Sequence, residues 1–90
     1  MRTPAPSLAK AFGQAVRSRR RALGLSQEEL AWRAGLNRTY VTDVERGARN
    51  VSLATMEKLA RALKSPLFML LRHAERAWDI APGTAGREPA

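Results

Sequence analysis

Four polar side chains in the segment RTYVTDVER have spacings that would bring them to one face of a helix, and an arginine precedes them at the helix N-terminus. Arg38 stands at the first position, and four more recur at i, i+3, i+4 and i+7, namely Thr39, Thr42, Asp43 and Arg46. An arginine can donate two hydrogen bonds to guanine O6 and N7, and a threonine can bond a base edge or contact a thymine methyl group. The segment therefore carries the chemistry needed to read the edges of bases.

Asp43 is the member of this face that fits least well, because a carboxylate that faces phosphates is repelled. It could accept a hydrogen bond from cytosine N4, or it could brace Arg46 or Thr39. Both roles stay open at this point.

The opposite side of the segment is apolar and should face the protein. It carries Val41 and Val44, but Glu45 falls on the same side. Arg20 likewise falls on the apolar face of an earlier predicted helix. Because a buried charge needs a partner, we expect both of these charged residues to be structural.

Capping and stop signals divide the first part of the chain into two helices. The first begins at Leu8 and ends at Gly24. The second begins with a capping box in which Ser26 and Glu29 satisfy each other's backbone amides. It ends after little more than two turns at Gly35.

Three more helices follow. The third runs from about residue 38 to 46, with Asn37 as N-cap and Gly47 at the left-handed stop position. Ser52 caps the fourth, and Ser65-Pro66 begins the fifth, since proline is well tolerated in a first helical turn. No strand signal is seen, so the predicted class is all-α with five helices around a small core.

Helical periodicity also predicts the apolar residues that build this core. By helix in chain order they are Phe12, Val16 and Leu23; Leu30, Ala31 and Ala34; Val41 and Val44; Leu53, Met56, Leu59, Ala60 and Leu63; and Leu67, Leu70, Leu71, Ala74 and Trp78. We expect residues 1–7 to form a flexible arm, residues 8–80 the folded domain, and residues 81–90 a disordered tail.

The charge of the chain favours a polyanionic partner. The chain has 16 Lys and Arg against 8 Asp and Glu, a net charge of +8, which attracts nucleic acid or an acidic membrane face. No apolar run reaches the roughly 20 residues that cross a bilayer. The absence of cysteine excludes disulfides and thiolate zinc sites, and the one histidine, His73, has no carboxylate constellation nearby. We therefore expect no enzyme, cofactor, metal or small-molecule ligand, and a cytoplasmic protein.

The second and third predicted helices, joined by a tight glycine turn, have the geometry of a helix-turn-helix. The segment LSQEELAWRAGLNRTYVTDVERGARNVSLATMEKLARAL resembles the Xre/Cro type of helix-turn-helix regulator, over roughly residues 12–71. That resemblance implies a lambda-repressor-like domain. The phrase LNRTYVTDVERGARNVSL is most similar to the controller proteins of restriction-modification systems, which are small dimeric DNA-binding regulators.

The resemblance implies roles for individual residues on DNA. Arg38, Thr39, Tyr40, Thr42 and Asp43 would contact bases, although Tyr40 could instead pack sideways against a neighbouring helix. Phosphate contacts would come from the start of the second helix and from the exit of the third, at Gln27, Arg46, Arg49, Asn50 and Ser52. Arg20 and Glu45 would pair with each other and tie the first helix to the third.

Several exposed residues are expected outside this surface. Phe68 and Met69 should project away from the core, and with Leu71 we assign them to a homodimer interface, since two half-sites one DNA turn apart require a twofold dimer. We expect Arg17, Arg19 and Arg21 to be solvated. Trp32 should face outward, either at a partner surface or over an arginine stem.

The predicted function is a transcriptional regulator that binds a palindromic operator in double-stranded DNA and contacts RNA polymerase, as an autoregulating controller protein. Two alternatives stay open, namely an antitoxin-type protein-binding module and a plain phage or plasmid repressor.

Overall fold

The computed structural model describes residues 7–79, and every regular element in that range is a helix. The five predicted helices are confirmed with bounds α1 Leu8–Ala22, α2 Gln27–Ala34, α3 Arg38–Arg46, α4 Leu53–Ala62 and α5 Leu67–Asp79. The arm and tail predicted for the two ends fall outside the described residues, apart from Ser7. That residue is the N-cap of α1 and accepts a hydrogen bond from the Lys10 amide, so it belongs to the helix and not to the arm.

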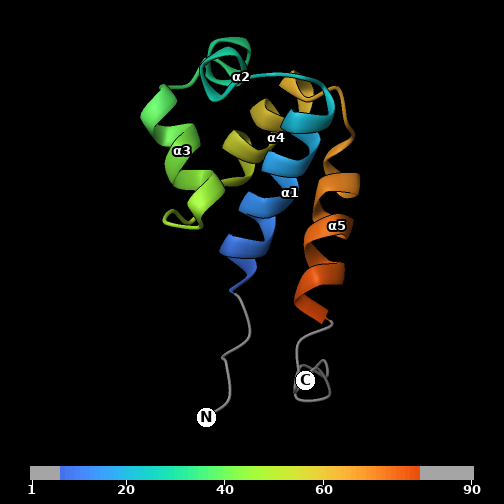
Figure 1. The fold of residues 1–90 in the computed structure, drawn as a ribbon. Helices are drawn as coiled ribbons and strands as arrows, with labels where there is room; N and C mark the ends of the chain where they lie inside the picture. Colours follow the sequence, from blue (N-terminus) through green and yellow to red (C-terminus); the bar gives the residue numbers. More distant parts are fainter. Residues whose placement is uncertain (1–6, 80–90) are drawn as a thin grey trace.

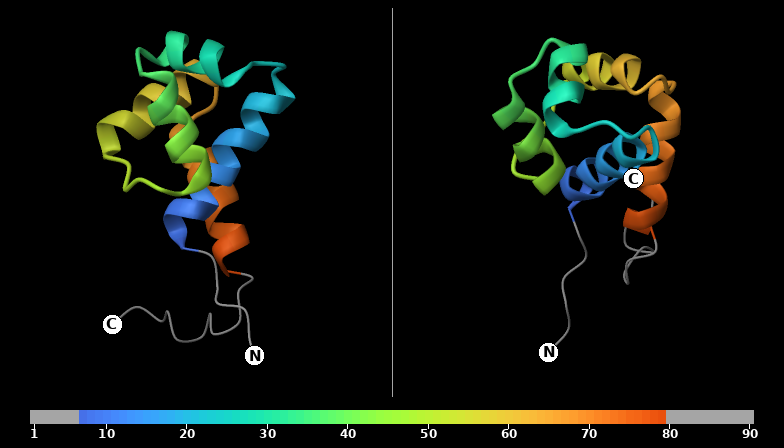
Figure 2. Two further views of the ribbon diagram at one scale, coloured as in Figure 1. Left: turned by 60° about the vertical axis from the view of Figure 1, so that its left-hand side comes forward. Right: turned by 45° about the horizontal axis from the view of Figure 1, so that its top comes forward.

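Helix α1 is the central element of the arrangement. It packs against α3 on one side and α5 on the other, while α2 packs against α3 and α4. Helices α1 and α5 run antiparallel, so the first turn of α1 and the last turn of α5 lie at the same end of the molecule (Figure 1). Figure 1 and the right-hand view of Figure 2 show α3 on the opposite side of α1 from α5.

Short-range signals fix the ends of the helices that present α3. The Ser26 and Glu29 capping box is present, with Ser26 accepting from the Glu29 amide at 3.0 Å and Glu29 accepting from the Ser26 amide at 2.9 Å. Asn37 accepts from the Thr39 amide at 2.7 Å. Gly35 and Gly47 end α2 and α3 with φ of 69° and 76°, a conformation that glycine adopts without strain.

The core matches the predicted apolar faces with two exceptions. Its fully buried large side chains are Leu30, Leu59, Leu63, Val16, Val41 and Val44. Leu23 is 36% exposed because it lies beyond the last turn of α1, and Leu25 from the following loop is buried in its stead. Leu53 is 68% exposed, since the first turn of α4 borders an open groove together with Pro66 and Leu67. Both leucines were wrongly predicted to lie in the core.

Two glycines allow α1 and α3 to approach more closely than other residues would permit. A Cβ on Gly13 of α1 would overlap the backbone oxygens of Val44 and Glu45. A Cβ on Gly47 would lie 2.6 Å from the Cα of Lys10. Real Cβ atoms do not occur at such distances, so both positions require glycine, and they set where α3 stands relative to α1.

Within the described residues, no helix combines the length and the apolar character needed to cross a membrane.

Candidate DNA interface

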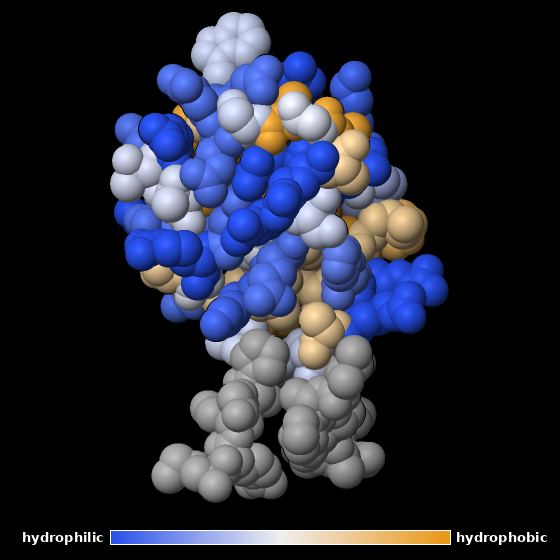
Figure 3. All heavy atoms as spheres, in the orientation of Figure 1, coloured by the Kyte–Doolittle hydropathy of each residue, from blue (hydrophilic) through white to orange (hydrophobic). Residues whose placement is uncertain are grey.

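The scaffold of the candidate site is the α2-turn-α3 unit. The amide of Leu36 donates to the carbonyl of Ala31 at 2.8 Å, which closes the turn after α2. Val41 and Val44 are 0% and 1% exposed, so they anchor α3 to the core from its inner side. The outer side of α3 is thereby held toward solvent, and the surface on this side of the molecule is largely hydrophilic (Figure 3).

The first turn of α3 presents the residues predicted to read bases. Arg38 and Thr39 are exposed, and Thr42 is half-buried. The Thr42 hydroxyl can donate to the Arg38 carbonyl, at 3.1 Å, or to Oε1 of Gln27, at 2.9 Å. A threonine bonded in this way can still accept a hydrogen bond or present its methyl group outward. The structure therefore brings Arg38, Thr39 and Thr42 together on one accessible surface.

Gln27 is the first residue of α2, and the sequence had suggested that it contacts phosphate. In the structure its side chain lies between α2 and α3. Its Nε2 donates to Oε1 of Glu45 at 3.0 Å, while its Oε1 lies within reach of the Thr42 hydroxyl. The side chain thus joins the two helices of the unit. One amide hydrogen of Nε2 is not used by these bonds and can still donate to an anion.

A two-bond ion pair joins α1 to α3 and brings together the two charged residues found on apolar faces. Arg20 Nε lies 2.6 Å from Glu45 Oε2, and Arg20 Nη2 lies 3.0 Å from Oε1. The side chains are only 12% and 3% exposed. Arg20 Nη1 also donates to the Leu25 carbonyl at 2.8 Å, so the pair satisfies most of its hydrogen-bonding capacity internally.

A second charged cluster lies on the outer side, at the C-terminal half of α3. Asp43 Oδ1 accepts from Arg46 at 2.9 Å, and Oδ2 accepts from Arg49 at 3.3 Å. The guanidinium carbon of Arg49 lies 4.8 Å from the centroid of the Tyr40 ring, a cation–π distance. The hydrogen bond from Arg46, followed by that from Arg49, holds the pKa of the Asp43 carboxyl below its usual range, against the opposing effect of its partial burial.

This cluster shows what Asp43 and Tyr40 contact within the protein, while their contacts with bases stay predictions. Asp43 braces Arg46, as one alternative proposed, and it also binds Arg49, which the sequence did not suggest. Tyr40 is half-buried and packs against the core cluster, and the Arg49 guanidinium lies over its ring. No periodic signal links residues 40 and 49, because a glycine turn separates them.

The remaining predicted phosphate contacts are placed differently from one another. Asn50 is exposed in the loop between α3 and α4. The hydroxyl of Ser52 caps α4, because it accepts from the Thr55 amide at 3.1 Å and lies 3.0 Å from the Thr55 hydroxyl. The Ser52 hydroxyl is thus engaged within α4, whereas the Asn50 side chain is exposed, and contact of either residue with phosphate stays a prediction.

Arg19 corrects the prediction that the arginines of α1 other than Arg20 are solvated. Its Nε donates to the Leu63 carbonyl at 3.0 Å and its Nη2 to the Lys64 carbonyl at 3.2 Å. It therefore satisfies carbonyls at the C-terminal end of α4. Arg17 and Arg21 are exposed, as predicted.

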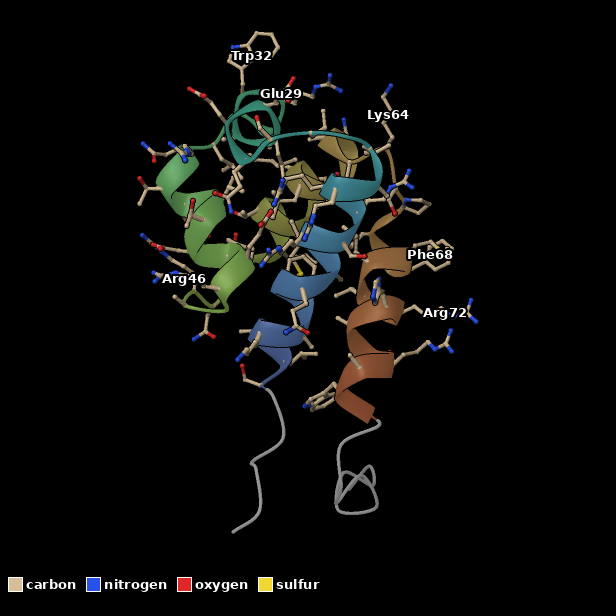
Figure 4. The ribbon with its side chains drawn as sticks, in the orientation of Figure 1. Glu29, Trp32, Arg46, Lys64, Phe68 and Arg72 are labelled. Atoms are coloured by element: carbon tan, nitrogen blue, oxygen red, sulfur yellow. The ribbon has the colours of Figure 1, made fainter. Side chains whose placement is uncertain are left out.

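The residues assigned to a dimer interface separate into two groups. Phe68 and Met69 are 65% and 45% exposed. Leu71 is only half-exposed and packs against the core, where it borders a pocket of about 210 Å³ with Phe12 and other residues. Phe68 and Arg72 project from the opposite side of the molecule to Arg46 (Figure 4).

Trp32 stands apart from both surfaces. It is 83% exposed, and it projects away from the molecule from the last turn of α2 (Figure 4). Such exposure is incompatible with its lying flat over an arginine stem, one of its two predicted placements.

Comparisons with known proteins agree with this geometry. A helix-turn-helix family model matches residues 16–70. The control protein C.BamHI of Bacillus amyloliquefaciens is 53% identical over 53 residues, which cover 58% of this chain and 65% of that protein. The control protein C.SmaI of Serratia marcescens is 52% identical over 56 residues, covering 62% of this chain and 67% of that protein. The match therefore spans about two thirds of the length of each control protein.

Similarity extends to a solved structure. The crystal structure of the restriction-modification controller protein C.AhdI from Aeromonas hydrophila superimposes with a TM-score of 0.67 and 54% sequence identity. The superposition covers 70% of this chain and 94% of that chain. By sequence, fold and the arrangement of α2 and α3, the chain belongs to the helix-turn-helix family of Xre-type DNA-binding regulators, and controller proteins of restriction-modification systems are among its relatives.

Proposed function

We propose that this protein is a controller protein of a restriction-modification system, a transcriptional regulator and not an enzyme, that acts in the bacterial cytoplasm. The observation that carries the proposal is the exposed polar face of α3. Its inner valines and Glu45 fix the helix to the protein, while Arg38 and Thr39 stand free at its N-terminus. A helix held in this way can enter the major groove with its first turn leading.

The surrounding charges support this orientation on DNA. Arg46, Arg49 and Asn50 lie around the end of α3, on the flank where a phosphate backbone would pass. On the other flank, the N-terminus of α2 carries Gln27, and the capping box there does not engage the amides of Gln27 and Glu28. Contacts of this kind fix the orientation of a protein on DNA, and the base contacts of α3 then select the sequence.

A single short helix reads only a few base pairs, so we propose that two copies bind an inverted repeat. The exposed Phe68 and Met69 on α5 supply an apolar surface for dimerisation. Beside them, Leu53, Pro66 and Leu67 line a groove of about 650 Å³ that can receive a side chain from the second copy. Because Phe68 and Arg46 project from opposite sides, the dimer surface and the DNA surface do not compete (Figure 4).

In vitro selection from a random duplex library tests this function. The salt concentration should be about 0.15 M, because a chain with net charge +8 binds any DNA in dilute buffer. We expect enrichment of an inverted repeat whose half-sites lie about one DNA turn apart. Failure of a folded protein to enrich any motif would contradict the proposal and favour a module that binds a protein partner.

Two variants separate base reading from dimerisation. Arg38→Gln should lose preference at one base pair in each half-site, by about 1–3 kcal/mol. Arg72→Gln is its matched control, since it removes the same charge from an exposed arginine on the other side of the molecule. Phe68→Ser should yield a monomer in sedimentation analysis. A dimeric Phe68→Ser protein would place the interface elsewhere.

For regulation, we propose that the dimer binds upstream of its own gene and contacts RNA polymerase there. A promoter fused to a reporter should respond to the concentration of the protein, and Arg38→Gln should abolish the response. A chromosomal neighbourhood without restriction-modification genes would contradict the controller role while leaving operator binding intact.

A further inference from the structure

Asp43 holds two arginines of the DNA-facing surface at once. One carboxylate oxygen accepts from Arg46 and the other from Arg49, at 2.9 and 3.3 Å. The side chain of Asp43 is 19% exposed, while those of the two arginines are 67% and 49% exposed. Both cations can therefore reach a phosphate, but only by leaving or sharing the carboxylate.

The carboxylate also determines where Arg49 lies. Arg49 is in the loop after α3, where its backbone is not held by helical hydrogen bonds. In the structure its guanidinium is held between Asp43 and the ring of Tyr40, 4.8 Å from the ring centroid. The hydrogen bond that Arg49 donates to Asp43 thus keeps this loop cation close to α3, beside Tyr40, which is expected to contact bases.

We propose that Asp43 is a specificity-determining positioning residue, which competes with DNA phosphates for Arg46 and Arg49 and thereby weakens binding to non-operator DNA more than binding to the operator. This inference rests on the proposed function. Its physical basis is that binding to arbitrary sequence depends almost wholly on cations that meet phosphates. A carboxylate that is bonded to two of those cations makes them less available to phosphates, and it thereby lowers the affinity for DNA of arbitrary sequence.

On the operator the same carboxylate has an opposing, favourable effect. There the base contacts of α3 supply much of the discrimination, and Asp43 keeps Arg49 and Tyr40 in place before the DNA arrives. A side chain ordered in advance loses less conformational entropy on binding. Removal of the Asp43 charge should therefore strengthen operator binding only slightly.

The test compares Asp43→Asn with the parent on two duplexes, the selected operator and a scrambled duplex of equal length. Dissociation constants are measured from about 0.05 to 0.3 M salt. We expect the scrambled duplex to bind at least about threefold tighter to the variant. The slope of log K against log salt should steepen by about 1–2, since each new phosphate contact contributes about 0.9. The ratio of scrambled to operator dissociation constants should fall severalfold.

Glu57→Gln is the matched control, because it removes the same charge from another arginine pair. Glu57 binds Arg61 at 3.4 Å on α4, with side chains that are 62% and 81% exposed. Both residues line the groove proposed to receive the second copy, so sedimentation analysis must show that this variant assembles like the parent. A second control places Asp43→Asn in an Arg46→Gln/Arg49→Gln background. There the gain on scrambled DNA should vanish, because no arginine is left to release.

Three results would overturn the inference. Equal gains for Asp43→Asn and Glu57→Gln would mean that net charge alone matters. Unchanged affinity for scrambled DNA would mean that Asp43 only braces the loop. Loss of operator binding alone would mean that Asp43 reads a base. Thermal unfolding checks that each variant is folded. Asp43→Ser also removes the carboxylate and should give the same result as Asp43→Asn.

Failure of the proposed function gives a different pattern. If the parent protein enriches no motif, there is no operator. The scrambled-duplex titrations would still show whether Asp43 restrains the two arginines.

Discussion

Replacing Glu45 by alanine should strongly destabilise this domain, because it would leave the buried Arg20 without its charged partner. Glu45 accepts two hydrogen bonds from Arg20 and one from Gln27. Without it, the Arg20 guanidinium, in a side chain only 12% exposed, would keep just its bond to the Leu25 carbonyl. Removal of one partner of a buried pair costs about 3–5 kcal/mol, since the other charge is left uncompensated.

That cost is large for a domain of this size. Small domains are stable by roughly 5–15 kcal/mol, and each 1 kcal/mol shifts the melting temperature by about 4–8 °C. Glu45→Ala should therefore melt at least about 12 °C below the parent. The loss is measured by circular dichroism at 222 nm, in thermal melts and in urea titrations.

Two further variants make this prediction specific. Glu57→Ala removes a carboxylate from an exposed pair on α4, which should cost no more than about 0.5 kcal/mol. The double variant Arg20→Met/Glu45→Leu removes both buried charges, and it should recover most of the loss, because a buried ion pair adds little over apolar side chains of similar volume. A Glu45→Ala protein that melts within a few degrees of the parent would refute the reasoning.

Three more predictions concern features away from the ion pair. Gly13→Ala should push α3 away from α1, because its Cβ would overlap the Val44 carbonyl; a lower melting temperature and weaker operator binding in gel-shift assays should result. Arg19→Met should cost about 1–2 kcal/mol in urea titrations, through the lost bonds to the carbonyls of Leu63 and its neighbour. The capping-box hydrogen bonds with Ser26 lower the pKa of Glu29. The stability that the ionised Glu29 contributes is therefore complete above about pH 5 and is lost as pH falls through the folded pKa. Glu29→Gln should flatten the decline in melting temperature between pH 5 and 3.

The sequence predicted those parts of the fold that depend on neighbours along the chain. The capping box of Ser26 and Glu29 and the stop at Gly47 involve residues within one turn of each other, so their signals are local. Sequence reasoning could also predict that Arg20 and Glu45 each have a charged partner, because a charge on an apolar helix face must be paired. Family resemblance supplied which partner it was.

Other features depend on how whole helices pack, and no local signal reports that. Arg19 reaches carbonyls more than forty residues away, at the end of α4, so its role exists only once α1 and α4 are in place. Gln27 was expected to face phosphate, yet α2 and α3 meet closely enough for it to bridge them. The role of Gly13 was missed for the same reason. From the sequence, a glycine within a helix indicates only a weak helix former, and it does not report that another helix packs against it.

The site was predictable to a similar extent. Helical periodicity placed Thr39 and Thr42 on an outward face, with Arg38 at the start of the same helix, and in the structure Arg38 and Thr39 are exposed while Thr42 is half-buried. The hydrogen bond that Arg49 donates to Asp43 could not be foreseen, since it crosses the left-handed turn at Gly47 and depends on how that loop folds back.

The position of α1 between α3 and α5 has a consequence for operator architecture. In a dimer joined through α5, α1 fixes the position of α3 relative to the dimer interface, and the tight contacts at Gly13 and Gly47 leave α3 little room to slide. The distance between the two α3 helices of the dimer is then fixed by the fold. One base pair inserted between the half-sites displaces them by about 3.4 Å and also rotates one about the DNA axis relative to the other. Spacing should therefore be selected as strictly as base sequence, and changes should be tolerated only where the DNA itself bends or twists to compensate.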